Sequence, residues 1–194
     1  MQLDSHTAQL FQAIAQDDEH AFQQLHESYY ARLLVYGKAF TLDKELIRDH
    51  IQNLFVGIWQ QRKKLANLKQ PDAYLYAGLR NNLRSAIRQS NNRKRLLEKN
   101  WTPSKEELPK DADPEDYAYL HRLIESLPTK QKEVILLRFF HEKSYAEIGQ
   151  IMSINGQIAQ NYAAKALKKL RKHAHILEKI IYPMLALLSS NYFV

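Results

Sequence analysis

Apolar residues recur along this chain at intervals of three and four positions, and no stretch alternates apolar with polar residues. Spacings of three and four place side chains on one face of an α-helix, whereas alternation is typical of a half-buried strand. The clearest helix is predicted within residues 43–63. Its buried stripe is predicted to consist of Ile47, Ile51, Leu54, Phe55 and Ile58. Because the chain also has only five glycines, the pattern predicts an all-α protein.

The opposite side of this predicted helix is polar except for one valine. At 3.6 residues per turn it carries Glu45, Asp49, Gln52, Asn53, Val56 and Gln60. Such a face is either an ordinary solvated surface or a docking surface for a partner protein. The pattern by itself leaves both interpretations open.

A second helix is predicted from Pro71 to Arg95, because proline and aspartate at its start suit a first helical turn. Its core side is predicted to hold Ala73, Tyr76, Ala77, Leu79, Leu83 and Ile87. On the outside we expect a basic ridge with two asparagines, made of Arg80, Asn81, Asn82, Arg84 and Arg88. Like charges four residues apart repel by roughly 0.2–0.5 kcal/mol in a free helix, and phosphates would relieve this repulsion.

Residues 144–172 predict two short helices joined by a tight turn. Ser144 and Glu147 have the spacing of a capping box, so one helix begins at Ser144, and Asn155 is a natural cap for the next. The buried side of the second helix is predicted to hold Ala159, Tyr162, Ala163, Ala166 and Leu170. Its outward and marginal positions are Gln157, Ile158, Gln160, Asn161, Ala164, Lys165 and Lys168. This is the pattern of a DNA-binding helix-turn-helix, although a plain antiparallel helix pair would also fit.

The chain is predicted to form two small helical domains joined by an acidic linker. Residues 102–116 have six acids, two lysines and three of the six prolines, a composition that opposes a packed helix. We therefore assign a first domain to 1–100, the linker to 101–117, a helix-turn-helix domain to 118–175, and an apolar helical tail to 176–194.

The distribution of charge favours an anionic partner, because the basic residues are clustered along the chain. The net charge is +7. Residues 80–99 carry seven basic residues against one acid, and a second basic cluster lies at 165–172. The chain has no cysteine, which excludes disulfides and thiol nucleophiles and is compatible with a reducing cytosol. No secretory signal or membrane-spanning stretch is recognisable, so we expect a soluble, cytoplasmic protein without membrane insertion.

No catalytic or metal motif is found. Two histidines, His173 and His175, lie close together but lack a third ligand, and no phosphate-binding loop is present. Three other histidines, His20, His26 and His141, are interpreted as surface residues. We expect no enzymatic activity, no cofactor, no metal and no small-molecule substrate.

Several segments, taken in order, resemble bacterial sigma factors. The stretch "SLPTKQKEVILLRFFHEKSYAEIGQIMSINGQIAQNYAAKALKKLR" resembles region 4. The stretches "FQQLHESYYARLLVYG", "IRDHIQNLFVGIWQQR" and "DAYLYAGLRNNLRSAIR" resemble region 2. The short linker and the lack of other sigma regions are similar to the extracytoplasmic-function group.

The resemblance implies a role for each face. Region 2 would bind core RNA polymerase through Asp49 and Gln52, on the face that also carries Asn53, Val56 and Gln60. It would contact and open the minus-ten promoter element through Arg80, Asn81, Arg84 and Arg88, with the loop "RKKLANLKQ" beside them. Region 4 would read the minus-thirty-five element through Gln157, Ile158, Gln160, Asn161, Lys165 and Lys168. The linker would thread toward the polymerase active-site channel, and an anti-sigma protein would be a further partner.

The sequence departs from the family pattern at a few positions. Ser85 replaces an aspartate of the basic helix, Asn155 replaces a serine cap, and Ile158 with Ala159 replace a threonine and a valine. Asparagine caps a helix about as well as serine, so these changes concern base preference more than fold. Two other functions remain open: an autonomous helix-turn-helix transcription regulator, and a helical scaffold that binds no DNA. The clustered charge argues against the scaffold.

Overall fold

The computed structural model describes residues 2–91 and 123–170, and all regular elements in these ranges are helical, as predicted. Four helices form the N-terminal group: α1 (Gln2–Ile14), α2 (Glu19–Gly37), α3 (Lys44–Leu65) and α4 (Pro71–Asn91). The C-terminal group consists of α6 (Thr129–Ile135), a π-helical continuation η2 (Leu136–Phe140), α7 (Tyr145–Met152) and α8 (Gly156–Leu170). The predicted linker 101–117, the tail 176–194 and the pair His173 and His175 lie outside the described residues.

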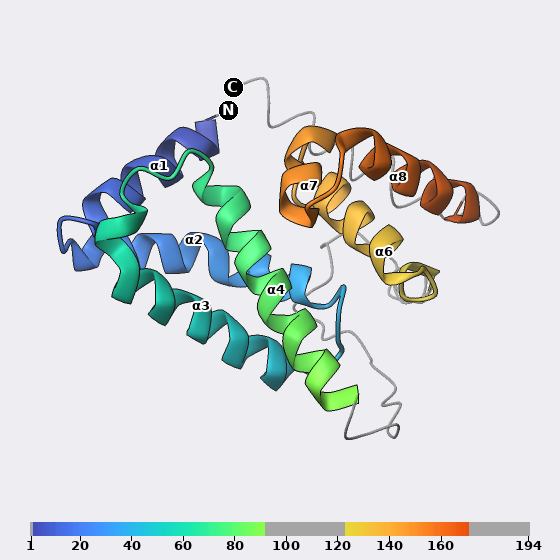
Figure 1. Cartoon of the computed structure of the whole chain (residues 1–194), viewed down its shortest axis with the longest axis horizontal. Coiled ribbons are helices and arrows are strands. Elements are labelled where there is room, and N and C mark those ends of the chain that lie inside the picture. The colour runs from blue at the N-terminus through green and yellow to red at the C-terminus, as the bar shows by residue number, and fades with distance from the viewer. Residues whose placement is uncertain (1, 92–122, 171–194) are drawn as a thin grey trace, which may run out of the picture.

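The N-terminal helices pack against one another in every pairing (Figure 1). The predicted stripe of α3 is buried in their core, and Asp18 and Asp43 cap α2 and α3 by accepting hydrogen bonds from Ala21 N and Leu46 N. A side-chain oxygen at this position satisfies a backbone N–H that the helix leaves unpaired, which fixes where each helix begins.

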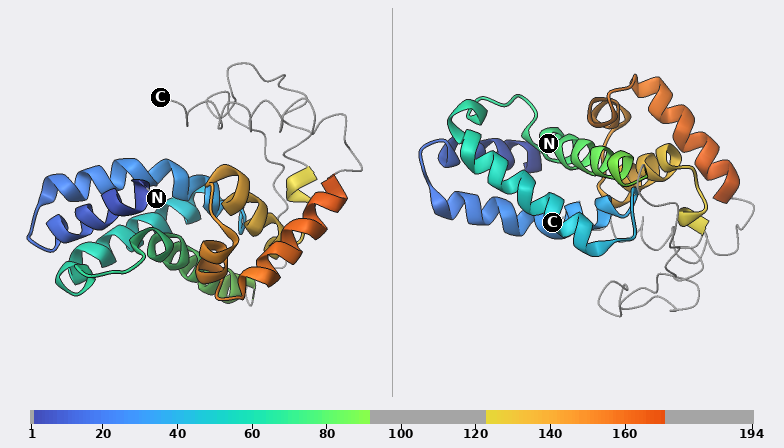
Figure 2. Two further views of the ribbon diagram at one scale, coloured as in Figure 1. Left: turned by 90° about the horizontal axis from the view of Figure 1, so that it is seen from above. Right: turned by 60° about the horizontal axis from the view of Figure 1, so that its bottom comes forward.

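The C-terminal helices form the second group, in which α8 packs on both α6 and α7. Figure 2 shows the two groups side by side, and α4 contacts α7. Buried apolar residues of both groups join in one large cluster that includes Leu79 and Tyr76 from α4 together with Val134, Leu137 and Ile148. A second, smaller cluster lies within the C-terminal group and consists of Leu127, Ile135, Ala166 and Leu170. The interface between the groups therefore belongs to the hydrophobic core of this structure.

Candidate nucleic-acid and polymerase interfaces

The turn between α7 and α8 is built from the predicted caps. The Ser144 hydroxyl accepts from Glu147 N, and the Glu147 carboxylate accepts from Ser144 N at 2.7 Å, which completes the capping box. At the start of α8, Asn155 Oδ1 accepts from Gln157 N at 2.8 Å. Ser153 ends α7 with a left-handed φ of 55°. These local bonds set the direction in which α8 leaves the turn.

Gly149 lets the turn pack against α7. A Cβ atom at this position would lie 2.7 Å from the carbonyl oxygen of Ile154 and 3.0 Å from the backbone N of Gly156. Both neighbours are backbone atoms, so they cannot move aside without moving the turn itself. A residue without a side chain is thus required where the two helices meet.

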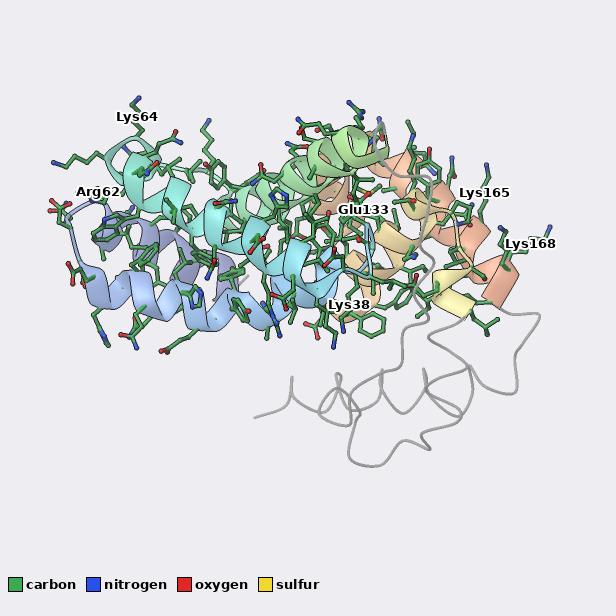
Figure 3. All side chains as sticks on the ribbon, turned by 90° about the horizontal axis from the view of Figure 1, so that it is seen from below. Lys38, Arg62, Lys64, Glu133, Lys165 and Lys168 are labelled. Carbon is green, nitrogen blue, oxygen red and sulfur yellow. The ribbon has the colours of Figure 1, made fainter. Side chains whose placement is uncertain are left out.

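The outward side of α8 is fully accessible. Its buried residues are Ala159, Ala163, Ala166 and Leu170, and Tyr162, which was predicted to be buried, is half-buried. Its exposed residues are Gln157, Ile158, Gln160, Asn161, Ala164, Lys165, Lys168 and Lys169. Ile158 is 44% exposed. In Figure 3, Lys165 and Lys168 point away from the molecule at the end remote from Arg62 and Lys64. The predicted division of α8 into a buried and an exposed side is confirmed.

The polar face of α3 is exposed as well. Asp49, Gln52, Asn53, Val56 and Gln60 all lie on the surface, opposite the buried stripe. Val56 is 52% exposed, and Val56 and Ile158 are the large apolar side chains most open to solvent among the described residues. A single exposed apolar side chain is usual on a solvated surface, so the docking role of this face stays a prediction.

The basic ridge of α4 differs from the prediction. Arg88 and Asn81 are exposed and Arg84 is half-buried, but Arg80 is only 6% exposed. The expectation that Arg80 faces solvent is wrong, because α4 packs against both groups of helices and its Arg80 side faces α6. The segment predicted as a loop beside the ridge begins inside a helix, because Arg62 lies in the last turn of α3. Arg62 pairs there with Asp17 and lies over the Trp59 ring.

Arg80 forms a buried ion pair with the C-terminal group. Its Nε donates to Glu133 Oε1 at 2.6 Å, and the Tyr36 hydroxyl donates to the same oxygen at 2.8 Å. Glu133 is 1% exposed. Burial raises the pKa of Glu133 above its usual value, although Arg80 and Tyr36 each oppose this shift. A carboxylate in α6 is thus held by side chains from α2 and α4.

A second buried ion pair joins the groups through Asp72 and Lys143. The Tyr29 hydroxyl also donates to Asp72 at 2.7 Å and lies 2.7 Å from Thr7 Oγ1. Burial, followed by the neighbouring Asp72 charge, raises the pKa of Tyr29. This pair joins the first turn of α4 to the segment just before α7.

His141 is buried between the two groups, so its interpretation as a surface residue is wrong. Its ring packs against the rings of Tyr36 and Tyr76, and its Nδ1 lies 3.1 Å from the Tyr76 hydroxyl. Nε2 is buried and has no hydrogen-bond partner among the residues that the structure describes. Burial, with Arg32 and Lys143 nearby, lowers the pKa of His141 to about 3. Of the other two, His20 is exposed and His26 is half-buried against Phe55.

These buried contacts were missed by the sequence reasoning. A weak signal was present for Glu133, which lies directly beside Val134 and Ile135 in an apolar run. No pattern within α4 distinguishes Arg80 from Arg84, because an arginine at an exposed position and one that meets a distant carboxylate look alike in sequence.

Residues 117–170 match the family model described as "Sigma-70, region 4". The helices within these residues are therefore similar to sigma-70 region 4. The match covers α6, η2, α7 and α8, so the turn, the capping box and the exposed side of α8 all lie within the matched residues. No curated protein sequence matches the chain.

Solved structures resemble the chain well beyond region 4. CnrH, solved in complex with the cytosolic domain of CnrY, has a TM-score of 0.61 and 18% identity, over 88% of this chain and 97% of that chain. The sigma factor RpoE, solved in complex with the anti-sigma factor NepR from Bartonella quintana, has a TM-score of 0.63 and 16% identity, over 81% and 96%. The predicted all-α fold and the predicted resemblance to sigma factors are confirmed.

The described residues include no group of three or more side chains suited to hold a metal ion. Among those same residues, no helix is both long and apolar enough to span a membrane.

Proposed function

We propose that this chain is a sigma factor that binds core RNA polymerase and directs it to specific promoters, where it recognises and opens the DNA. The exposed side of α8 carries most weight in this proposal. It presents Gln157 and Asn161 on the first turns of α8, with Lys165 and Lys168 further along. The helix caps and Gly149 fix the orientation of this helix. Amide side chains can form two hydrogen bonds with an adenine, whereas lysines bind phosphates as point charges.

The proposed roles of the two groups follow from their accessible faces. Region 4 reads the minus-thirty-five element with Gln157, Ile158, Gln160, Asn161, Lys165 and Lys168. The face of α3 with Asp49, Gln52, Asn53, Val56 and Gln60 binds core polymerase. The ridge of α4 contacts the minus-ten element through Asn81, Arg84 and Arg88, together with Arg80 once Glu133 releases it.

Two further parts of the proposal come from the relatives. RpoE was solved with an anti-sigma factor, and we propose a protein of that kind as a partner here. The proposed site of action is the cytoplasm, where the polymerase and the promoter DNA are found, and the chain acts as a subunit without catalysing a reaction itself.

The polar face of α3 favours this function over that of an autonomous regulator, which has no need of a polymerase-docking surface. The test adds the purified full chain to sigma-free core polymerase and genomic DNA and sequences the transcripts. We expect transcripts with defined start sites that share two upstream elements. Asp49→Arg should abolish them, because it reverses a charge on the docking face.

The matched control is Glu27→Arg, which makes the same charge change at an exposed position of α2 outside the proposed docking face. Its carboxylate accepts a solvent-exposed hydrogen bond from Gln23 Nε2, and exposed substitutions of this kind usually change stability by less than about 0.5 kcal/mol. Equal loss of transcription in both variants would contradict the assignment of the α3 face. DNA binding by the chain without any polymerase-dependent transcripts would favour the autonomous regulator.

A further inference from the structure

The contact between the two groups of helices includes Arg80, a side chain that the proposed function assigns to promoter DNA. Arg80 lies on the ridge assigned to promoter DNA, yet its guanidinium pairs with Glu133, and the pair is almost completely buried. A carboxylate and a phosphate both offer oxygen acceptors to an arginine. Arg80 can therefore pair with Glu133 or contact a DNA phosphate, but the closed arrangement leaves it no access to DNA.

The geometry of the proposed promoter complex also excludes the closed arrangement. The two promoter elements are by name about 25 base pairs apart, or about 85 Å at 3.4 Å per base pair. A domain of 100 residues has a radius of gyration of only about 13 Å. In this structure α4 contacts α7, and the Tyr76 hydroxyl of α4 lies 3.1 Å from His141 Nδ1. The groups must separate before both elements can be bound at once.

The chain between the groups is long enough for this separation. Residues 92–122 connect α4 to the C-terminal helices, and a fully extended segment of 31 residues spans about 100 Å. Separation therefore requires no unfolding of either group.

The buried contacts are of a kind that can be exchanged. Two ion pairs, Arg80 with Glu133 and Asp72 with Lys143, cross the interface. Desolvation of buried ions offsets much of their attraction, so such pairs contribute little net stability while they are formed. Among the described ranges 2–91 and 123–170, the buried His141 Nε2 also has no hydrogen-bond partner, a feature that typically lowers stability. Because these buried polar groups contribute little net stability, a ligand that binds the same charged side chains can separate the two groups of helices.

We propose that Glu133 acts as an internal substitute for a DNA phosphate, and that the closed arrangement holds Arg80 away from DNA until the groups separate. The device rests on the proposed function, because it presumes that α4 contacts promoter DNA. Free protein is then mostly closed and binds DNA weakly, whereas polymerase docking selects the open form. The affinity of α4 for DNA thus depends on whether the two groups are in contact, because Glu133 pairs with Arg80 only when they are.

The first measurement follows the separation itself. The chain has no native cysteine, so spin labels can be attached at Ser28→Cys in α2 and Gln150→Cys in α7, both exposed positions. Pulsed electron paramagnetic resonance should give one short distance in the otherwise unchanged chain. Glu133→Gln should increase the ratio of open to closed molecules by at least about tenfold, because Arg80 then lacks a compensating charge.

The second measurement is the affinity of the free chain for a fluorescent DNA duplex of about 30 base pairs, long enough to hold both elements, at low salt. When only the open form is competent, apparent affinity rises in proportion to its population, so Glu133→Gln should bind at least about tenfold more tightly. The matched control is Glu125→Gln. It removes the same charge from an ion pair with Lys132 that lies within the C-terminal group, and its affinity should rise less than about twofold.

A third variant separates the contribution of Arg80 from that of region 4. Adding Arg80→Gln to Glu133→Gln removes the uncompensated charge, so the fraction of open molecules should fall again. In the molecules that are open, the salt slope of binding should be lower by about 1, since one phosphate contact is lost. If Glu133→Gln does not fold, as judged by circular dichroism, Asp72→Asn replaces it, because this change weakens the other ion pair between the groups.

The outcomes distinguish the device from the proposed function. A distance that stays short in both Glu133→Gln and Asp72→Asn overturns the device and leaves promoter recognition by α8 untouched. Opening with a gain in affinity no larger than that of Glu125→Gln overturns the competition at Arg80. Absence of DNA binding in every open variant overturns the proposed function instead.

Discussion

Helices α4 and α8 both carry a basic side that amphipathic patterning places on the surface, yet only α8 keeps all of that side accessible. Helix α8 packs against α6 and α7, which lie on its alanine-rich side. Helix α4 packs against α1, α2 and α3 and also contacts α7. Its contact with the C-terminal group covers Arg80 and leaves Arg88 exposed. A helix in contact with two groups buries side chains outside its apolar stripe as well. Any charged side chain among them then needs a partner of opposite charge.

The comparison is sharpest at Arg80 and Arg88, two arginines of one helix with opposite environments. Arg80→Ala leaves Glu133 buried without its cation, and removal of one partner of a buried pair typically costs about 3–5 kcal/mol. Arg88→Ala should change the free energy of unfolding by less than about 0.5 kcal/mol. Urea denaturation of both variants measures the difference. Equal effects would mean that the closed arrangement does not persist in solution, because separation of the groups exposes both arginines.

A second prediction concerns the packing of α7 against the turn that precedes α8. Gly149→Ala should destabilise the protein by about 1–3 kcal/mol, because the added Cβ meets the backbone of the turn, at Ile154 and Gly156. The control is Gly57→Ala in α3, where an added Cβ has no neighbour within 4 Å. That change should stabilise the helix by roughly 0.5–1 kcal/mol. Thermal unfolding followed by circular dichroism gives both values, and a neutral Gly149→Ala would show that the turn can adjust.

Within α8, base reading and phosphate binding should be separable. Asn161→Ala should weaken binding of the cognate upstream element by about 1–3 kcal/mol and flatten discrimination among base variants. Lys168→Ala should weaken all sequences alike and reduce the salt slope by about 1. Binding of the holoenzyme to a panel of promoter variants at several salt concentrations distinguishes the two. The same sequence-independent loss in both variants would exclude base reading by Asn161.

The smallest expected effect is a pH dependence of the closed arrangement. His141 has a pKa of about 3 when buried, against 6.5 when free, so the closed form cannot take up the proton that the open form binds. Stability of the closed form should therefore fall as the pH drops below about 6.5, by about 1.4 kcal/mol between roughly pH 7.5 and 5.5. The distance between the groups, measured at both pH values, should report more open molecules at the lower one.

The control for this effect is His141→Gln, which lacks the titrating ring. The other charged groups at the interface are retained in both proteins: Arg32, Asp72, Arg80, Glu133 and Lys143. The raised pKa of Glu133 acts in the opposite direction, because the closed form then binds a proton more readily as the pH falls. Only the difference between the two proteins is assigned to His141, and an identical pH response in both would contradict its role.

The features that were predicted correctly from the amino-acid sequence depend on neighbours along the chain. Periodicity identified the buried stripe of α3 and the two sides of α8, and the capping box at Ser144 and the cap at Asn155 are present as predicted. Each of these depends on residues within a few positions, where spacing along a helix fixes the geometry. The resemblance to sigma factors likewise came from segments in a fixed order, and the region 4 match agrees with it.

The contacts between the two groups of helices could not be predicted from the amino-acid sequence. Arg80 and Glu133 are 53 positions apart, and Tyr76 and His141 are 65 apart, which is too far for a helical period to relate them. Whether a charged side chain meets solvent or an opposite charge depends on which surfaces pack together, and amphipathic spacing carries no information about that choice. This choice affects stability through desolvation. A charged side chain costs little free energy in water, but once buried it must be paired.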